Sequence, residues 1–217
     1  MRSSLLIPVL AFAIGAPVLL GQTSSLPELP QLDLADFPSV IREQVQEAYD
    51  AARSNPRDAK TSGELGMLLD LYKRRESAAI CYERAHRLDP DSFRWLYYLG
   101  SLRAAQGKRE EATATLRAAL RLKPDYLPAR LKLAENLLAV GNFEEAGEIY
   151  GVIVKQHPDA AEAYYGIGRI RAAKGDLTAA VESYRKSSEL FPAYGAAHYA
   201  LALAYRKLGD NRKSEEH

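Results

Sequence analysis

Residues 93–123 read FRWLYYLGSLRAAQGKREEATATLRAALRLK and contain two apolar patterns with a glycine between them. In the first pattern leucines recur at intervals of three from Leu96 to Leu102, which is the spacing of one helix face. Gly107 breaks the pattern, and a second one follows that ends before Pro124. The stretch therefore predicts a helix, a tight turn and a second helix.

This unit recurs along the chain with a period of 34 residues. A proline marks the end of each copy, at Pro56, Pro90, Pro124, Pro158 and Pro192. A helix pair of this size cannot bury its apolar faces alone, so such units stack on one another. We therefore predict an all-α solenoid with full repeats at residues 59–92, 93–126, 127–160 and 161–194, and a partial fifth repeat at 195–217.

Four positions of the repeat keep one type of residue. The seventh and twenty-fourth are large: Leu65, Leu99, Leu133, Ile167 and Leu201, then Tyr82, Leu116, Tyr150 and Tyr184. The eighth and twentieth are small: Gly66, Gly100, Ala134, Gly168 and Ala202, then Ala78, Ala112, Ala146 and Ala180. Large residues fill a core, and small ones let two helix backbones approach closely.

These positions resemble the tetratricopeptide repeat, whose 34-residue pattern runs W-x2-L-G-x2-Y, then A-x3-F, then P. The repeat at 161–194 matches it at Tyr164, Ile167, Gly168, Ala180, Tyr184 and Pro192. Departures occur at the two aromatic positions of the first helix, where the chain has Arg103, Arg171, Ser62 and Arg130. The resemblance implies a right-handed α-solenoid of the exported bacterial type, and it says little about function because these repeats serve unrelated processes.

In the family that the chain resembles, positions 2, 5, 6, 9, 12 and 13 of the first helices usually face a ligand on the concave side. The candidate partner-binding residues that this implies are Lys60, Arg94, Tyr97, Tyr98, Leu131, Lys132, Glu135, Tyr165, Arg169, Tyr199 and Arg206. Tyrosine and arginine offer a large contact area with a polar end, which suits a groove that binds a peptide or helix. An alternative is that some of these tyrosines only pack between adjacent repeats.

The two ends of the chain differ from the repeats. Residues 1–21 have a positive start and an apolar run, and we expect an export signal that directs the chain to the periplasm or the cell exterior. An alternative is membrane anchoring by residues 5–20. Residues 22–38 are rich in proline and predict an extended linker, and residues 39–55 predict an N-terminal capping helix.

At the C-terminal end the partial repeat lacks most of its second helix. We therefore expect an uncovered apolar face around residues 199–208. Either the chain is a fragment of a longer protein, or this face is a contact surface for self-association.

Turn and cap residues follow the same period. A left-handed residue is expected at the end of each first helix, at Gly107, Gly141, Gly175 and Gly209. Lys73 occupies this place in the first repeat, so a different turn is expected there. Side chains available to cap the first helices are Asp58, Ser92, Asp125 and Asp159.

The composition offers little chemistry. The net charge is +1, from 29 basic and 28 acidic residues, so a nucleic-acid partner is not expected. Cys81 is the only cysteine, and we expect a buried structural thiol, with a reactive thiol as the alternative. The four histidines are His86, His157, His198 and His217, and none has metal-ligand spacing. We therefore expect no metal site, no cofactor and no catalytic residues.

The sequence thus predicts a non-catalytic module or scaffold that binds a segment of another protein. Two alternatives remain open. The repeats are the recognition part of a longer enzyme or electron-transfer protein that continues past residue 217, or they form a self-assembling structural spacer.

Overall fold

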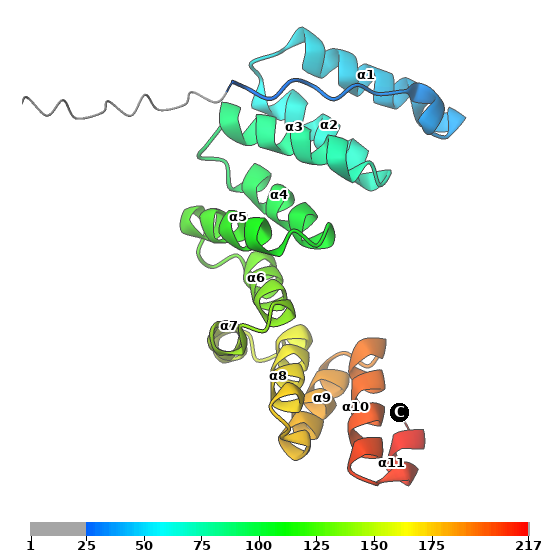
Figure 1. The fold of residues 1–217 in the computed structure, drawn as a ribbon, viewed down its shortest axis with the longest axis vertical. Helices are drawn as coiled ribbons and strands as arrows, with labels where there is room; N and C mark the ends of the chain where they lie inside the picture. The colour runs from blue at the N-terminus through cyan, green and yellow to red at the C-terminus, as the bar shows by residue number, and fades with distance from the viewer. Residues whose placement is uncertain (1–24, 217) are drawn as a thin grey trace, which may run out of the picture.

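The structure is a computed structural model that describes residues 25–216, and Figure 1 shows an elongated stack of helices with α1 at one end and α11 at the other. Residues 1–21, where we expect the export signal or anchor, lie outside the described part. Two 3-10 turns, η1 (Leu34–Asp36) and η2 (Ser39–Ile41), and α1 (Arg42–Ser54) precede the repeats. The repeats form α2 (Ala59–Leu71), α3 (Arg75–Leu88), α4 (Phe93–Ala105), α5 (Arg109–Leu122), α6 (Leu127–Ala139), α7 (Phe143–Gln156), α8 (Ala161–Ala173), α9 (Leu177–Leu190), α10 (Gly195–Lys207) and α11 (Asn211–Glu215).

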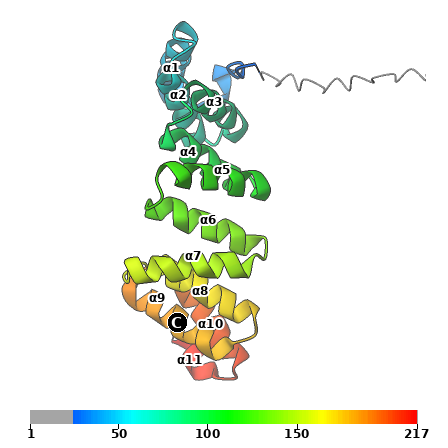
Figure 2. The same ribbon diagram turned by 90° about the vertical axis from the view of Figure 1, so that its left-hand side faces the viewer.

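Glycine at the eighth repeat position brings the two helices of a repeat together. A Cβ added at Gly100 would lie 2.8 Å from Cγ of Leu116, so α4 and α5 meet where a larger residue would collide. At Gly168 an added Cβ would lie 2.5 Å from Cδ1 of Tyr184. The third repeat has Ala134 at this position, and α6 and α7 pack less closely than α4 and α5. Figure 2 shows the successive layers that result from this pairing.

The turns repeat as regularly as the helices. The four predicted glycines have positive φ angles, 77° at Gly107, 81° at Gly141, 86° at Gly175 and 83° at Gly209. The expectation of a different turn in the first repeat is wrong, because Lys73 also adopts a left-handed conformation, with φ 62°. The same backbone bond closes both turns: Arg74 N donates to Leu69 O at 2.8 Å, as the amide of residue 108 donates to the carbonyl of residue 103 at 2.9 Å. Repeat geometry therefore overrides the cost of a left-handed lysine.

The predicted helix caps are only partly present. Asp58 accepts hydrogen bonds from two backbone amides in the first turn of α2, as expected. Ser92 precedes α4 but makes no capping bond through its side chain. Asp125 and Asp159 lie one residue before the N-cap positions of α6 and α8, where their carboxylates do not cap the helix. Asp125 instead pairs with Arg130 at 2.8 Å.

Residues 25–38, which we call the N-terminal strap, belong to the stretch for which an extended linker is expected. Their backbone is extended up to the 3-10 turns, but the strap packs on the first repeat. Phe37 is 2% exposed and lies in the same apolar cluster as Leu65 and Tyr82. Arg84 of α3, itself 7% exposed, donates to Pro27 O at 2.5 Å and also to the carbonyl of Pro56. The strap is thus part of the folded unit.

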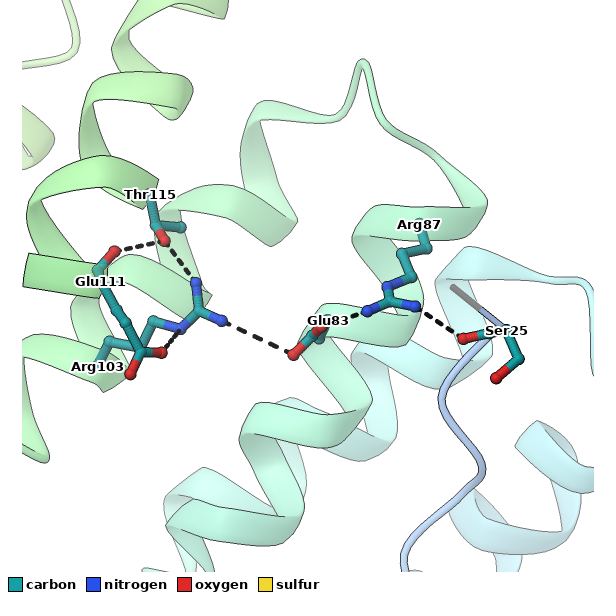
Figure 3. A network of polar contacts seen from close by, with 6 residues as sticks. All are labelled: Ser25, Glu83, Arg87, Arg103, Glu111 and Thr115. Atoms are coloured by element: carbon teal, nitrogen blue, oxygen red, sulfur yellow. Dashed lines mark hydrogen bonds and ion pairs between the residues drawn. The ribbon is translucent and has the colours of Figure 1, made fainter. Parts of the chain in front are cut away.

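A chain of polar contacts connects the strap with the first two repeats (Figure 3). Arg87 donates to Ser25 O at 2.7 Å and pairs with Glu83, which also lies 3.7 Å from Arg103. Arg103 then reaches α5, where it pairs with Glu111 at 3.2 Å and donates to Oγ1 of Thr115 at 2.6 Å. The network joins α3, α4 and α5 through one arginine.

Arg103 occupies a position where the repeat pattern has an aromatic residue. In the fourth repeat Arg171 occupies the same position and makes an equivalent contact. Arg171 donates to Oγ of Ser183 at 2.8 Å, and Thr115 and Ser183 hold the same repeat position. An arginine and a hydroxyl therefore replace the aromatic contact between the two helices of these repeats.

The last helices leave part of the C-terminal end open. α10 buries Leu201 and Ala204 against the preceding repeat. α11 covers another part of α10, where Oγ of Ser214 donates to Ala202 O at 3.0 Å. Tyr199 remains 72% exposed. Within residues 25–216, no helix combines the length and the apolar character that a membrane crossing requires.

The role of the close glycine contacts can be tested by one substitution at two positions. We expect Gly100→Ala to lower the free energy of unfolding by about 1–2 kcal/mol, because the new methyl group overlaps Leu116. Gly151 lies inside α7 with open space around it, so Gly151→Ala should raise the same quantity by about 0.5–1 kcal/mol. Urea denaturation followed by circular dichroism measures both. Equal effects at the two sites would contradict this account of the contact.

The strap can be tested at its buried anchor. Arg84→Ala leaves two carbonyl groups without their donor, and we expect a loss of about 2–3 kcal/mol in the free energy of unfolding. We also expect faster elastase cleavage within residues 25–38, for example after Ala35. Arg87→Ala removes an exposed bond to the same strap and should cost less than about 0.5 kcal/mol. Slow cleavage of the strap in the Arg84 variant would show that other contacts hold it.

Candidate functional site

A hollow of about 260 Å³ lies between α4, α6, α8 and the residues that follow α9. We call it the α6–α8 groove, and its lining residues are Tyr97, Pro128, Leu131, Lys132, Glu135, Tyr150, Glu162, Tyr165, Arg169 and Tyr194. Six of the sequence-based candidates meet here: Tyr97, Leu131, Lys132, Glu135, Tyr165 and Arg169. The fold therefore gathers residues of three consecutive repeats into one site.

Two equivalent tyrosine pairs stand on either side of α6. In the second repeat the rings of Tyr97 and Tyr126 lie 5.2 Å apart with an interplanar angle of 78°. In the fourth repeat the rings of Tyr165 and Tyr194 lie 5.2 Å apart at 64°. Both pairs combine the fifth and the last position of a repeat. Edge-to-face packing holds each ring in place, so the groove has rigid aromatic walls before any ligand arrives.

Tyr150 of α7 contributes a further part of the lining, although only 3% of its surface is exposed. Its ring lies over Gly166 of α8, where an added Cβ would be 2.3 Å from Cζ of Tyr150. The glycine thus makes room for a second-helix residue to reach the groove.

The charged residues of the groove are arranged unevenly. Lys132 and Glu135 pair with each other at 3.0 Å on α6. The guanidinium of Arg169 lies 5.8 Å from the centre of the Tyr165 ring. Among residues 25–216, no ion pair involves Arg169 or Glu162. Both charges therefore remain available to a ligand.

Three phenol groups of the groove, those of Tyr97, Tyr150 and Tyr194, stay protonated near neutral pH. Burial, together with the neighbouring Tyr165 and Glu162, raises the pKa of Tyr194 to about 12. Burial also raises the pKa of Tyr97 and of Tyr150, while Arg169 acts in the opposite direction on Tyr150. Neutral hydroxyls can donate and accept hydrogen bonds, which suits peptide backbone groups.

Three family models match the chain and together extend over most of the repeats. Those described as tetratricopeptide repeat match residues 70–126 and 103–170, and one described as TPR repeat matches residues 168–209. The chain is built of tetratricopeptide repeats. No curated protein matches it in sequence.

Solved structures of tetratricopeptide repeat proteins have the same fold. MamA 41-end from Desulfovibrio magneticus RS-1 is 22% identical over 73% of this chain and 89% of that chain, with a TM-score of 0.66. YrrB, described as a TPR protein with an unusual peptide-binding site, is 22% identical over 79% and 89%, with a TM-score of 0.62. The APC/C hetero-tetramer Cut9–Hcn1 is 18% identical over 80% and 35%, with a TM-score of 0.69. The predicted fold, an all-α, right-handed α-solenoid, is confirmed.

The remaining candidates at ligand-facing positions of the tetratricopeptide repeats lie outside the groove. Lys60 is 3.9 Å from Glu64, and Arg94 lies 4.8 Å from the centre of the Trp95 ring. Tyr98 stacks on the buried ring of Tyr82 at 5.6 Å, which agrees with the packing alternative for this tyrosine. Tyr199 and Arg206 are exposed on α10 and belong to the C-terminal end of the stack.

The sequence reasoning missed four lining residues of the groove: Pro128, Tyr150, Glu162 and Tyr194. Pro128 and Glu162 hold the second position of their repeats, which the family pattern already marks as ligand-facing, so this signal was present. Tyr150 was assigned to the core alone, and the small Gly166 opposite it was the signal for its second role. Tyr194 is the last residue of its repeat. The ligand-facing positions of the family pattern all lie in the first helices, so they do not include it.

Elsewhere the described residues hold little reactive chemistry. Cys81 is buried, as predicted, and burial raises the pKa of its thiol to about 12 although Arg84 lies nearby. Within residues 25–216, no group of three or more histidine, cysteine, aspartate or glutamate side chains could hold a metal ion. The α6–α8 groove is therefore our candidate site.

Proposed function

We propose that the chain is a non-catalytic binding module that holds a short segment of another protein in the α6–α8 groove. The observation that carries this proposal is the convergence in one hollow of four tyrosines, Leu131 and an arginine that makes no ion pair with the residues the structure describes. Tyrosine and arginine dominate the binding energy of many protein interfaces because they combine large contact area with hydrogen bonding. YrrB, which shares the fold, is described as having a peptide-binding site, and this supports the same use of the repeats.

The dimensions of the groove favour a peptide over a small molecule. Its volume of about 260 Å³ lies below the usual range for small-molecule sites, which begins near 300 Å³. One or two side chains of an extended segment fill such a hollow, while the backbone continues along the neighbouring first helices. Few anchors in an open groove give affinities of the order of micromolar.

The groove can be tested with Leu131→Lys, which places a charge among its apolar walls. We avoid alanine variants of Tyr97 and Tyr165, because both rings pack on other aromatic rings and their loss would destabilise the fold. Decapeptides are first selected from a random phage-displayed library on the full chain, and their Kd is measured by fluorescence anisotropy. We expect Leu131→Lys to raise the Kd at least about tenfold.

Leu122→Lys provides the matched control for this test. Leu122 is a partly exposed leucine near the end of α5, outside the groove. We expect this variant to bind the selected peptides like the unmodified chain, with the melting temperature of both variants as a check on folding. Equal Kd values for Leu131→Lys and the unmodified chain would overturn the groove assignment.

Export of the chain is the second part of the proposal, and it rests on the residue pattern of positions 1–21. A fusion of residues 1–30 to alkaline phosphatase, an enzyme active only after export from a bacterial cytoplasm, should be active. Arginine in place of both Leu10 and Ile14 interrupts the apolar run and should abolish this activity. The mass of the exported fusion distinguishes a cleaved signal from an uncleaved anchor, and an inactive fusion would contradict export.

A further inference from the structure

The α6–α8 groove has unlike charges at its two ends. Glu162 and Arg169 both line it from α8, and they lie seven residues apart. Seven residues are about two helical turns, or about 10 Å along the helix axis, so both side chains project from nearly the same face. Tyr165 lies between them on this face. A ligand that follows α8 therefore passes a carboxylate, an aromatic ring and a guanidinium in that order.

The opposite wall does not cancel this polarity. On α6, Pro128 and Glu135 hold the repeat positions that Glu162 and Arg169 hold on α8. Pro128 carries no charge. Glu135 pairs with Lys132 at 3.0 Å, so these two charges neutralise each other. The end of the groove at Glu162 is therefore net negative, and the end at Arg169 is net positive.

Apolar surface occupies the space between the two charges. Leu131 and the rings of Tyr165 and Tyr194 line the groove there, and the two rings are held against each other at 5.2 Å. A charged ligand side chain would lose hydration against this surface without gaining an ion pair. The middle of the groove therefore fits an aliphatic or aromatic side chain.

We propose that the occupant of the groove is an extended segment with a basic and an acidic residue three positions apart and an apolar side chain between them. This inference rests on the proposed function and specifies the chemistry of its ligand. A segment in the extended polyproline II conformation rises about 3.1 Å per residue and makes one turn every three residues. Side chains three positions apart therefore project from the same side, about 9 Å apart, which is close to the separation along α8. The basic residue meets Glu162, the acidic residue meets Arg169, and the apolar side chain lies on Leu131 and the tyrosines.

The unlike charges at the two ends of the groove affect the orientation of the bound segment more than its affinity. Ion pairs at an open site contribute modestly to binding, while complementary charges discriminate between orientations of the same ligand. A peptide with one basic and one acidic residue should therefore bind about three- to tenfold more tightly than a peptide with acidic residues at both of these places.

The test uses two fluorescein-labelled peptides, Lys-Leu-Tyr-Glu and Glu-Leu-Tyr-Glu, each flanked by two glycines on both sides. The full chain should prefer the first peptide. The variant Glu162→Lys makes both ends of the groove positive, so it should prefer the second peptide. The control variant Glu189→Lys makes the same change of charge on α9, outside the groove, and should keep the original preference.

Inversion of the preference in the groove variant alone supports the inference. Equal binding of both peptides by the unmodified chain overturns it, and so does the same preference in the groove variant. A failure of both peptides to bind also overturns it. Peptides selected from the random library then show whether the proposed function fails too: binding that is sensitive to Leu131→Lys keeps the groove as a peptide site of different chemistry.

Discussion

The close approach of the two helices within each repeat is the contact on which the rest of the molecule depends. It is possible because the eighth position is glycine in the first, second and fourth repeats, where an added Cβ would lie 2.9 Å or less from the facing side chain. The facing residue is large, Tyr82, Leu116 or Tyr184, so each pair encloses its own part of the core. Only a closed pair presents a continuous surface to the next repeat. The stack is therefore a series of local contacts, and no single central core is needed.

Polar contacts complete this packing where the repeat pattern is not followed. Arg103 and Arg171 replace aromatic residues, yet each reaches a hydroxyl on the second helix of its own repeat. Arginine can do this because its long apolar stem covers surface while its planar head donates several bonds. In the second repeat the same side chain also extends the contact network towards the N-terminal strap (Figure 3). Arg103, which departs from the repeat pattern, thus connects α3, α4 and α5.

The groove follows from the same stacking. First helices of consecutive repeats lie beside one another, so equal repeat positions form rows across α4, α6 and α8. Aromatic pairs on the second and fourth repeats enclose the third, whose Leu131 and Lys132 are smaller or more flexible. Charges on α8 that lack partners within the described residues then give the hollow a direction. The proposed binding of a protein segment requires no rearrangement of the groove, because its aromatic walls are already packed.

The sequence by itself determined the period, the two helices of each repeat, the small and large core positions and the glycine turns, since all of these depend on residues close together in the chain. It also predicted six of the groove residues, because repeat position specifies which face of a helix a side chain occupies. The tertiary structure decided the rest. The strap is held by Arg84, which bonds to a residue 57 positions away, and Tyr150 reaches the groove only because Gly166 lies opposite it. Such contacts depend on the size and place of a partner distant in sequence, which periodicity alone does not specify.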